Sequence, residues 1–205
     1  MRSRSVCGKE IPFYARFLLK VRYSTVKPTI MSFKRIRFIS ATTLILCVVL
    51  FTGKPSFALS ANDAAPPIAL RDSSGTYFYL SDYTGPSAKK PAKGVIVNFF
   101  ASTCDPCRKE LPALNSLVDE LAQKNIKVVI IGYKEGFDGF IGMLEDLKVE
   151  KPVILSDPYG KAGKEYGVYG LPMTVFIRAD GKVKEIVRGE LTGKALKEKA
   201  AIFLK

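Results

Sequence analysis

A Cys-x-x-Cys pair, Cys104 and Cys107, stands at the junction between two segments of different periodicity. The segment before the pair, 94–101, is almost continuously apolar, which is typical of a buried strand. The segment after it, 105–124, repeats its leucines at helical spacing. We therefore expect the first cysteine at the amino end of a helix, where unpaired N–H groups and the helix dipole stabilise a thiolate. A thiolate attacks disulfides, and a second cysteine one turn later can resolve the mixed disulfide.

Two other interpretations of the pair remain open, half of a zinc site and a structural disulfide. A zinc site needs two more ligands, but the chain has no histidine, and Cys7 and Cys47 lie in an amino-terminal segment that has the features of a targeting sequence. A disulfide across so short a loop would constrain the unfolded chain little. Redox chemistry is therefore the favoured interpretation, and we expect no metal and no cofactor.

The net charge of +13 is concentrated at the amino end. Residues 1–58 carry eleven Lys or Arg against one acid, a net charge of +10. Residues 59–205 carry 21 basic and 18 acidic side chains, a net charge of only +3. The folded part of the chain therefore gives no electrostatic case for binding nucleic acid.

Residues 31–58 have the organisation of an export signal. Three basic residues within 34–37 precede an apolar run over 39–51, and Ser-Phe-Ala at 56–58 is a small-x-small cleavage pattern. A membrane-spanning helix usually needs about 20 apolar residues, so a cleaved signal is favoured over an uncleaved anchor formed by residues 38–52. Either arrangement predicts a periplasmic or otherwise extracytoplasmic protein.

Met31 would make a natural start of translation, so we favour the interpretation that residues 1–30 result from an over-extended start codon assignment. A transit-like segment is the alternative. Residues 59–67 are small and Pro-rich, which predicts a tether with no core of its own. The folded domain is expected over 68–205, with only two cysteines. Because disulfides form readily outside the cytoplasm, an active pair there needs a dedicated electron donor.

Periodicity and turn signals divide this domain into seven strands and four helices in a single α/β sandwich. Its first two strands flank an Asp-Ser-Ser-Gly turn, and its last two flank an Ala-Asp-Gly-Lys turn, so each pair predicts a hairpin. The strands are expected at 68–70, 76–80, 95–101, 127–133, 153–155, 173–178 and 183–187, and the helices at 105–124, 137–147, 159–166 and from Thr192 onward.

Four motifs make the chain resemble the thioredoxin superfamily, and within it the TlpA/ResA-like exported thiol-disulfide oxidoreductases. The resemblance covers residues 66–205. It implies a thioredoxin-like α/β sandwich, with a mixed central sheet flanked by helices and an extra N-terminal β-hairpin. The motifs are Val-Asn-Phe-Phe-Ala at 97–101 leading to the cysteine pair and Glu110-Leu111-Pro112, Asp-Pro-Tyr-Gly at 157–160, Tyr-Gly-Val at 166–168, and Gly-Leu-Pro-Met-Thr-Val-Phe-Ile at 170–177.

The resemblance also implies roles for single residues. In the family, the proline matching Pro172 is cis and lies against the cysteines, and the residue matching Leu171 offers backbone groups to an extended substrate. Glu110 matches the family's active-site acid, one helical turn after Cys107, and is expected to move protons for the sulfurs. A solvated glutamate in the first turn is the alternative. Asn98 stands where cytoplasmic thioredoxins carry a buried aspartate, which leaves proton transfer to Glu110.

The chain departs from the family pattern at two places. Thr103 replaces the family's tryptophan, and the chain contains no tryptophan, so the aromatic shield over the sulfur is missing. Thr103 is therefore placed with the expected substrate-binding residues. The negative charge of Asp105, in the Asp105-Pro106 dipeptide between the cysteines, should disfavour the thiolate and tune the pair towards a more reducing potential.

These observations predict an exported reductase of protein disulfides that acts through a mixed disulfide. The resemblance points to oxidised apocytochrome c as the substrate and to an integral-membrane thiol carrier as the electron donor, and we expect a monomer. One alternative is a copper metallochaperone that uses both thiolates. Another is a peroxiredoxin, which would need a proline where this chain has Val97.

Overall fold

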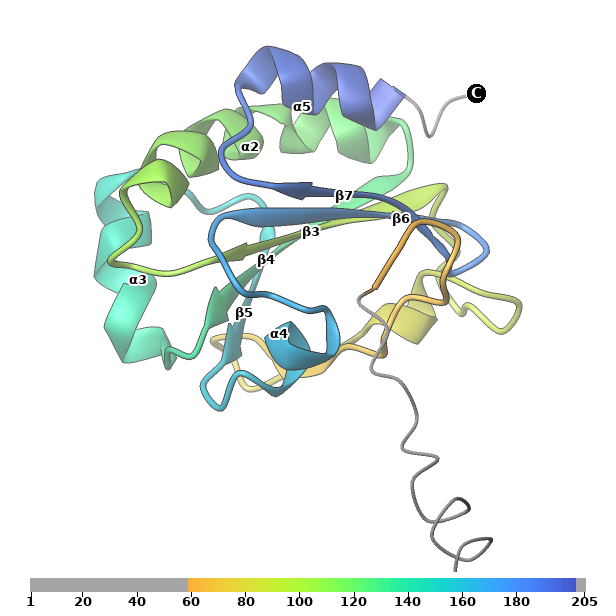
Figure 1. Cartoon of the computed structure of the whole chain (residues 1–205), viewed down its shortest axis with the longest axis horizontal. Helices are drawn as coiled ribbons and strands as arrows, with labels where there is room; N and C mark the ends of the chain where they lie inside the picture. Colours follow the sequence, from red (N-terminus) through yellow and green to blue (C-terminus); the bar gives the residue numbers. More distant parts are fainter. Residues whose placement is uncertain (1–58, 202–205) are drawn as a thin grey trace, which may run out of the picture. The chain divides into compact units, whose positions relative to one another are not determined.

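A mixed seven-stranded sheet runs through residues 59–201, the part of the chain that the computed structural model describes (Figure 1). The strands lie in the order β2-β1-β5-β4-β3-β6-β7. The three central strands β5, β4 and β3 are parallel, whereas the neighbours on both sides are antiparallel. The strands are β1 (Ala69–Arg71), β2 (Tyr77–Tyr79), β3 (Gly94–Phe100), β4 (Ile126–Tyr133), β5 (Val153–Asp157), β6 (Met173–Arg178) and β7 (Val183–Arg188).

Helices cover both faces of the sheet, as a sandwich requires (Figure 1). The first face packs against α2 (Asp105–Gln123), α3 (Phe137–Asp146) and α5 (Gly193–Ala200). The core on the second face draws its side chains from the β1–β2 hairpin, from η2 (Leu80–Asp82) and from the segment around α4 (Lys161–Glu165). The predicted fold class, including the additional hairpin at the amino end, is confirmed.

Strand β3 is the centre of this arrangement because all of its residues are buried. Ile96 and Phe100 point into the core under α2, and Val95, Val97 and Phe99 point into the core on the other face. A strand covered on both faces needs a continuous apolar run, which is the pattern that the sequence shows. The cysteine pair follows directly at the carboxyl end of this rigid strand.

The predicted elements are found with small changes at their ends, except for the helix expected over 159–166. That helix is shorter, because Gly160 has a left-handed φ of 65° and α4 begins only after it. The carboxylate of Asp157 fixes this start by accepting hydrogen bonds from the N–H groups of Lys161 and Gly163, both at 2.9 Å. Tyr159 is left outside the helix and is 93% exposed.

The segment predicted as a tether is hydrogen-bonded to the β6–β7 turn. The N–H of Asn62 donates to the carbonyl of Val183 at 2.8 Å, and the N–H of Val183 donates to the carbonyl of Asp63 at 2.9 Å. The N–H of Ala65 donates to the carbonyl of Gly181, also at 2.9 Å. This segment lacks a core of its own, but it is fixed against the domain.

The predicted amino-terminal segments, residues 1–30 and the signal or anchor at 31–58, lie outside the described residues. Within residues 59–201, no helix has the length and apolar character needed to cross a membrane.

Candidate active site

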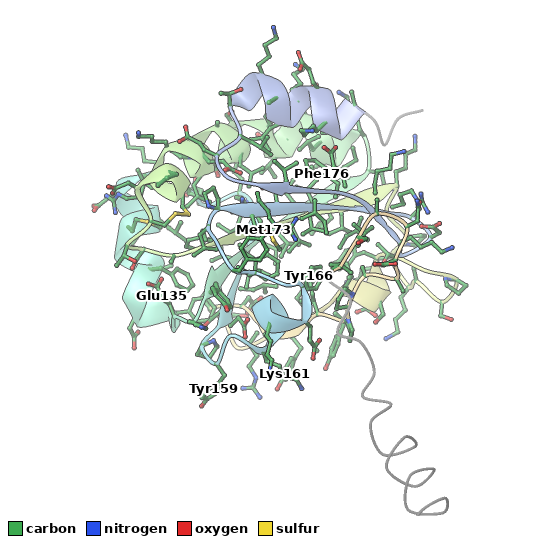
Figure 2. The ribbon with its side chains drawn as sticks, viewed as in Figure 1. Glu135, Tyr159, Lys161, Tyr166, Met173 and Phe176 are labelled. Carbon is green, nitrogen blue, oxygen red and sulfur yellow. A yellow bond between two sulfur atoms is a disulfide. The ribbon has the colours of Figure 1, made fainter. Side chains whose placement is uncertain are left out.

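Cys104 and Cys107 form a disulfide at the start of α2, with their Cα atoms 5.3 Å apart (Figure 2). Cys104 is the N-cap residue of the helix, and its sulfur accepts a hydrogen bond from the N–H of Cys107 at 3.3 Å. Cys107 is 1% exposed, whereas Cys104 is half-buried. An attacking group from solvent therefore reaches the Cys104 sulfur more easily, and the helix amino terminus favours the thiolate at that atom.

Three of the predicted site residues surround Cys104 on the surface. Thr103, Asp105 and Pro106 are all exposed. Pro106 lies at the beginning of the helix, where a missing N–H leaves no intrahelical hydrogen bond unmade. A protein that approaches the Cys104 sulfur therefore meets a small hydroxyl side chain and a carboxylate.

Glu110 lies one turn after Cys107 on α2, and it is only 1% exposed. Its Oε1 accepts hydrogen bonds from Nδ2 of Asn98 at 2.9 Å and from Oγ1 of Thr174 at 3.1 Å. Its Oε2 accepts a hydrogen bond from the N–H of Leu191 at 3.1 Å. The alternative of a solvated glutamate is therefore wrong, because this carboxyl is buried and held from three sides.

Sheet register brings the partners of Glu110 together. Asn98 on β3 and Thr174 on β6 are directly opposite each other in the antiparallel pair, and Nδ2 of Asn98 donates to Oγ1 of Thr174 at 3.0 Å. Oδ1 of Asn98 is buried and finds no hydrogen-bond partner among the described residues. The site therefore contains a buried polar cluster in which one acceptor, Oδ1 of Asn98, has no donor within residues 59–201.

Burial raises the pKa of Glu110 from 4.5 to about 7. The hydrogen bonds from Leu191 and Thr174 act in the opposite direction because they stabilise the carboxylate, while the negative charge of Glu190 adds to the rise. A group with a pKa near neutrality both accepts and releases protons at physiological pH.

A cis peptide bond joins Leu171 and Pro172, as the family resemblance implies. Pro172 is buried, and the half-buried Leu171 packs against the same core cluster as Cys104. The carbonyl of Pro172 accepts a hydrogen bond from the N–H of Gly189 at 2.9 Å. Because Leu191 bonds to Glu110, the loop between β7 and α5 ties the cis-proline segment to the helix that carries the cysteines.

Glu135 is a site residue that the motifs did not predict (Figure 2). Its carboxylate accepts two hydrogen bonds from Ser102, from the N–H at 2.9 Å and from the hydroxyl at 2.8 Å. Its own backbone is fixed to the end of β5, because the Ser156 hydroxyl donates to the Glu135 carbonyl at 2.8 Å and the Lys134 N–H donates to the Asp157 carbonyl at 2.9 Å. Its position just after a buried parallel strand is the signal that could have identified it.

No further ligand group accompanies the cysteines in the described part of the chain. Residues 59–201 contain no cluster of three or more His, Cys, Asp or Glu side chains that could hold a metal ion. A cavity of about 550 Å³ is lined by residues of α3, of β5 and of the turn between them, and none of the site residues lines it.

Comparisons with known proteins identify related chains. Residues 61–186 match the AhpC/TSA family, a range that includes the cysteine pair, Glu110 and Pro172. The chain is 31% identical over 142 residues to the thiol-disulfide oxidoreductase ResA of Bacillus subtilis, covering 69% of this chain and 74% of that protein. It is 30% identical over 177 residues to ResA of Oceanobacillus iheyensis, covering 78% of this chain and 85% of that protein. A solved Chlorobium tepidum structure, described as a thiol:disulfide interchange protein DsbE, gives a TM-score of 0.63 at 28% identity, covering 72% of this chain and 99% of that one.

Proposed function

Because the chain belongs to the AhpC/TSA family and is a thiol-disulfide oxidoreductase with a thioredoxin-like fold, we propose that it reduces protein disulfides outside the cytoplasmic membrane. One observation carries the proposal. The accessible Cys104 and the buried Cys107 share the first turn of a helix, with a buried acid one turn further on.

The reaction transfers two electrons in two exchange steps. In the reduced protein, the Cys104 thiolate attacks one sulfur of a substrate disulfide, so that a mixed disulfide forms and the other substrate sulfur leaves as a thiolate that takes up a proton. The Cys107 thiol then loses its proton and attacks the Cys104 sulfur. The second substrate sulfur leaves as a thiolate and is protonated in turn, and the Cys104–Cys107 disulfide forms. The substrate disulfide is reduced and the dithiol of the protein is oxidised.

Glu110 supplies the base for the second step. The resolving thiol is shielded from water, so its proton needs a nearby acceptor inside the protein. Glu110 follows Cys107 by one helical turn, and its pKa of about 7 allows it to take the proton at neutral pH and release it later. Asn98, Thr174 and the N–H of Leu191 hold the carboxyl in place during this transfer.

The charge beside the nucleophile favours the reducing direction. Asp105 follows Cys104 directly and is exposed, so its carboxylate disfavours a thiolate at that sulfur. A pair whose thiolate is poorly stabilised gives up its electrons more readily. The motif resemblance further favours oxidised apocytochrome c as the substrate and an integral-membrane thiol carrier as the donor.

A peroxidase function, which other proteins of this fold perform, finds no support in the site. The expected pattern places a proline seven residues before the reactive cysteine and a Thr or Ser three residues before it. This chain has Val97, which is fully buried in β3, and Ala101 at those positions.

Trapping tests the assignment of the two sulfurs. Cys107→Ser should accumulate mixed disulfides with protein substrates, because the resolving thiol is absent, whereas the matched Cys104→Ser variant should trap almost none. In the reduced wild type, alkylation should modify Cys104 much faster than Cys107. Equal alkylation rates, or trapping by Cys104→Ser instead, would contradict the mechanism.

Fractionation of the tagged full chain tests the location. The pattern in residues 31–58 predicts recovery outside the cytoplasm or in the membrane fraction. Active, unprocessed protein in the cytosol would refute export and leave the redox chemistry unaffected.

A further inference from the structure

An exposed aromatic side chain lies close to the cis proline. Tyr169, three residues before Pro172 in the loop between α4 and β6, is 80% exposed. Its ring is stacked against Arg188, whose guanidinium carbon lies 4.9 Å from the ring centroid. Such a contact restricts the orientation of a ring that would otherwise rotate freely in solvent. Tyrosine and arginine are also the residue types enriched where proteins bind other proteins.

Two chain segments meet at this pair because of the sheet register. Arg188 is the last residue of β7 and lies opposite Met173, the first residue of β6. The next residue, Gly189, donates its N–H to the carbonyl of Pro172. No ion pair occupies Arg188 in the described part of the chain. The stacked pair therefore presents an aromatic surface and an available positive charge next to the cis proline.

The backbone beside the pair is also unoccupied. Within residues 59–201, the main-chain groups of Tyr169, Gly170 and Leu171 take part in no hydrogen bond. Three consecutive residues with free N–H and C=O groups can pair with an extended chain that lies alongside them. A small disulfide compound has no backbone to form these hydrogen bonds.

From these features we propose that Tyr169 and Arg188 form a recognition shelf that selects extended polypeptides over small disulfides. The inference deepens the proposed function and rests on it, because the shelf would serve the same disulfide. The shelf also offers the aromatic contact that is missing at Thr103, which is exposed and has no ring. A polypeptide whose cysteine faces the Cys104 sulfur would lie along residues 169–171 and cover the free face of the tyrosine ring.

Single-turnover kinetics on the pre-reduced full chain test the proposal. The two oxidants are a synthetic unstructured peptide with an internal Cys-x-x-Cys disulfide and the small neutral compound hydroxyethyl disulfide. The reaction is quenched with acid, and the remaining thiols are alkylated and counted by mass. Tyr169→Ala and Arg188→Ala are compared with Tyr159→Ala, a matched control in which another highly exposed tyrosine is removed from the loop before α4 (Figure 2).

Tyr169→Ala should raise the peptide concentration needed for half-maximal rate about tenfold, as expected for loss of an aromatic anchor, while the limiting rate stays close to the wild-type value. Arg188→Ala should raise it about threefold, because the ring remains but is no longer held. Both variants should react with hydroxyethyl disulfide within about twofold of the wild type, and Tyr159→Ala should match the wild type with both oxidants. The proposal would be overturned if Tyr169→Ala reacted more slowly with both oxidants to the same extent. It would also be overturned if Tyr169→Ala needed no more peptide than the wild type for half-maximal rate. A wild type that reduces neither oxidant would instead refute the proposed function.

Discussion

Replacing Glu110 by glutamine should change how the stability of the oxidised protein depends on pH. The folded protein holds the Glu110 pKa at about 7, against an ordinary value of 4.5. A carboxyl with a raised pKa in the folded state stabilises the fold while it is protonated. That contribution is complete below pH 4.5 and is lost as the pH rises through about 7. Each pKa unit corresponds to about 1.4 kcal/mol, so the loss amounts to about 3 kcal/mol.

Urea unfolding followed by far-ultraviolet circular dichroism measures this difference, since the chain has no tryptophan to report by fluorescence. Between pH 4.5 and pH 8, the free energy of unfolding of the wild type should fall by about 3 kcal/mol relative to that of Glu110→Gln. The glutamine amide facing the Leu191 N–H should cost about 1 kcal/mol, but this cost is the same at every pH. All other titrating groups are shared and cancel in the comparison.

Glu120→Gln is a suitable control because the pKa of Glu120 moves in the opposite direction, to about 2, through its hydrogen bonds with Lys124 and Lys197. A lowered pKa contributes stability that is lost only as the pH falls towards 2, so this variant should stay parallel to the wild type between pH 4.5 and pH 8. Parallel curves for the wild type and Glu110→Gln would refute the reasoning, because they would mean that the Glu110 carboxyl ionises in the folded protein as it does in the unfolded chain.

Three further changes test other parts of the structure. Glu135→Ala should lower the free energy of unfolding by about 1 to 3 kcal/mol, because the N–H and the hydroxyl of Ser102 both lose their acceptor. Glu135→Gln keeps one acceptor oxygen and should lower it less. If chemical denaturation gave the same free energy of unfolding for both variants, the two-point contact would be contradicted. Asp105→His should make the cysteine pair more oxidising, because a carboxylate that disfavours the thiolate is replaced by a group that stabilises it; an unchanged equilibrium with glutathione would exclude this tuning. Gly132→Ala should destabilise the protein by about 1 to 3 kcal/mol, since the new β-carbon would lie 2.2 Å from Cε1 of the buried Phe140. A variant that melts at the same temperature as the wild type would disprove this steric limit.

Local patterns were sufficient to predict the elements around the cysteines. The apolar run predicts a strand that is buried throughout, and β3 is such a strand. The leucine spacing predicts a helix with one buried face, and α2 packs its leucines against the core in this way. The junction between β3 and α2 could therefore be located from sequence alone. The strand predicted at 173–178 matches β6 at both ends, and Thr192 caps α5 by accepting a hydrogen bond from the N–H of Ala195 at 3.3 Å. Signals of this kind succeed because residues adjacent in sequence determine them.

Contacts between distant parts of the chain could not be predicted in the same way. The pairing of Asn98 with Thr174 depends on the register between β3 and β6, because a slip of β6 by one residue would turn Thr174 to the face of the sheet opposite Asn98. The contact between Glu135 and Ser102 depends on β3 and β4 being neighbours in the sheet, which the order of elements along the chain does not determine. The burial of Glu110 follows from the first of these features and from the loop that brings Leu191 to its carboxyl group.

The contact of residues 62–65 with the β6–β7 turn affects how copies of this protein behave towards one another. Strand β7 is the outermost strand on its side of the sheet, and an open strand edge offers N–H and C=O groups to which a second molecule can add. Asn62 and Asp63 occupy both main-chain groups of Val183, where this edge begins. The segment therefore blocks edge-to-edge association at the first residue of β7. A shortened chain starting at Pro66 would leave that edge open and become prone to self-association, although every residue of the redox site would be retained.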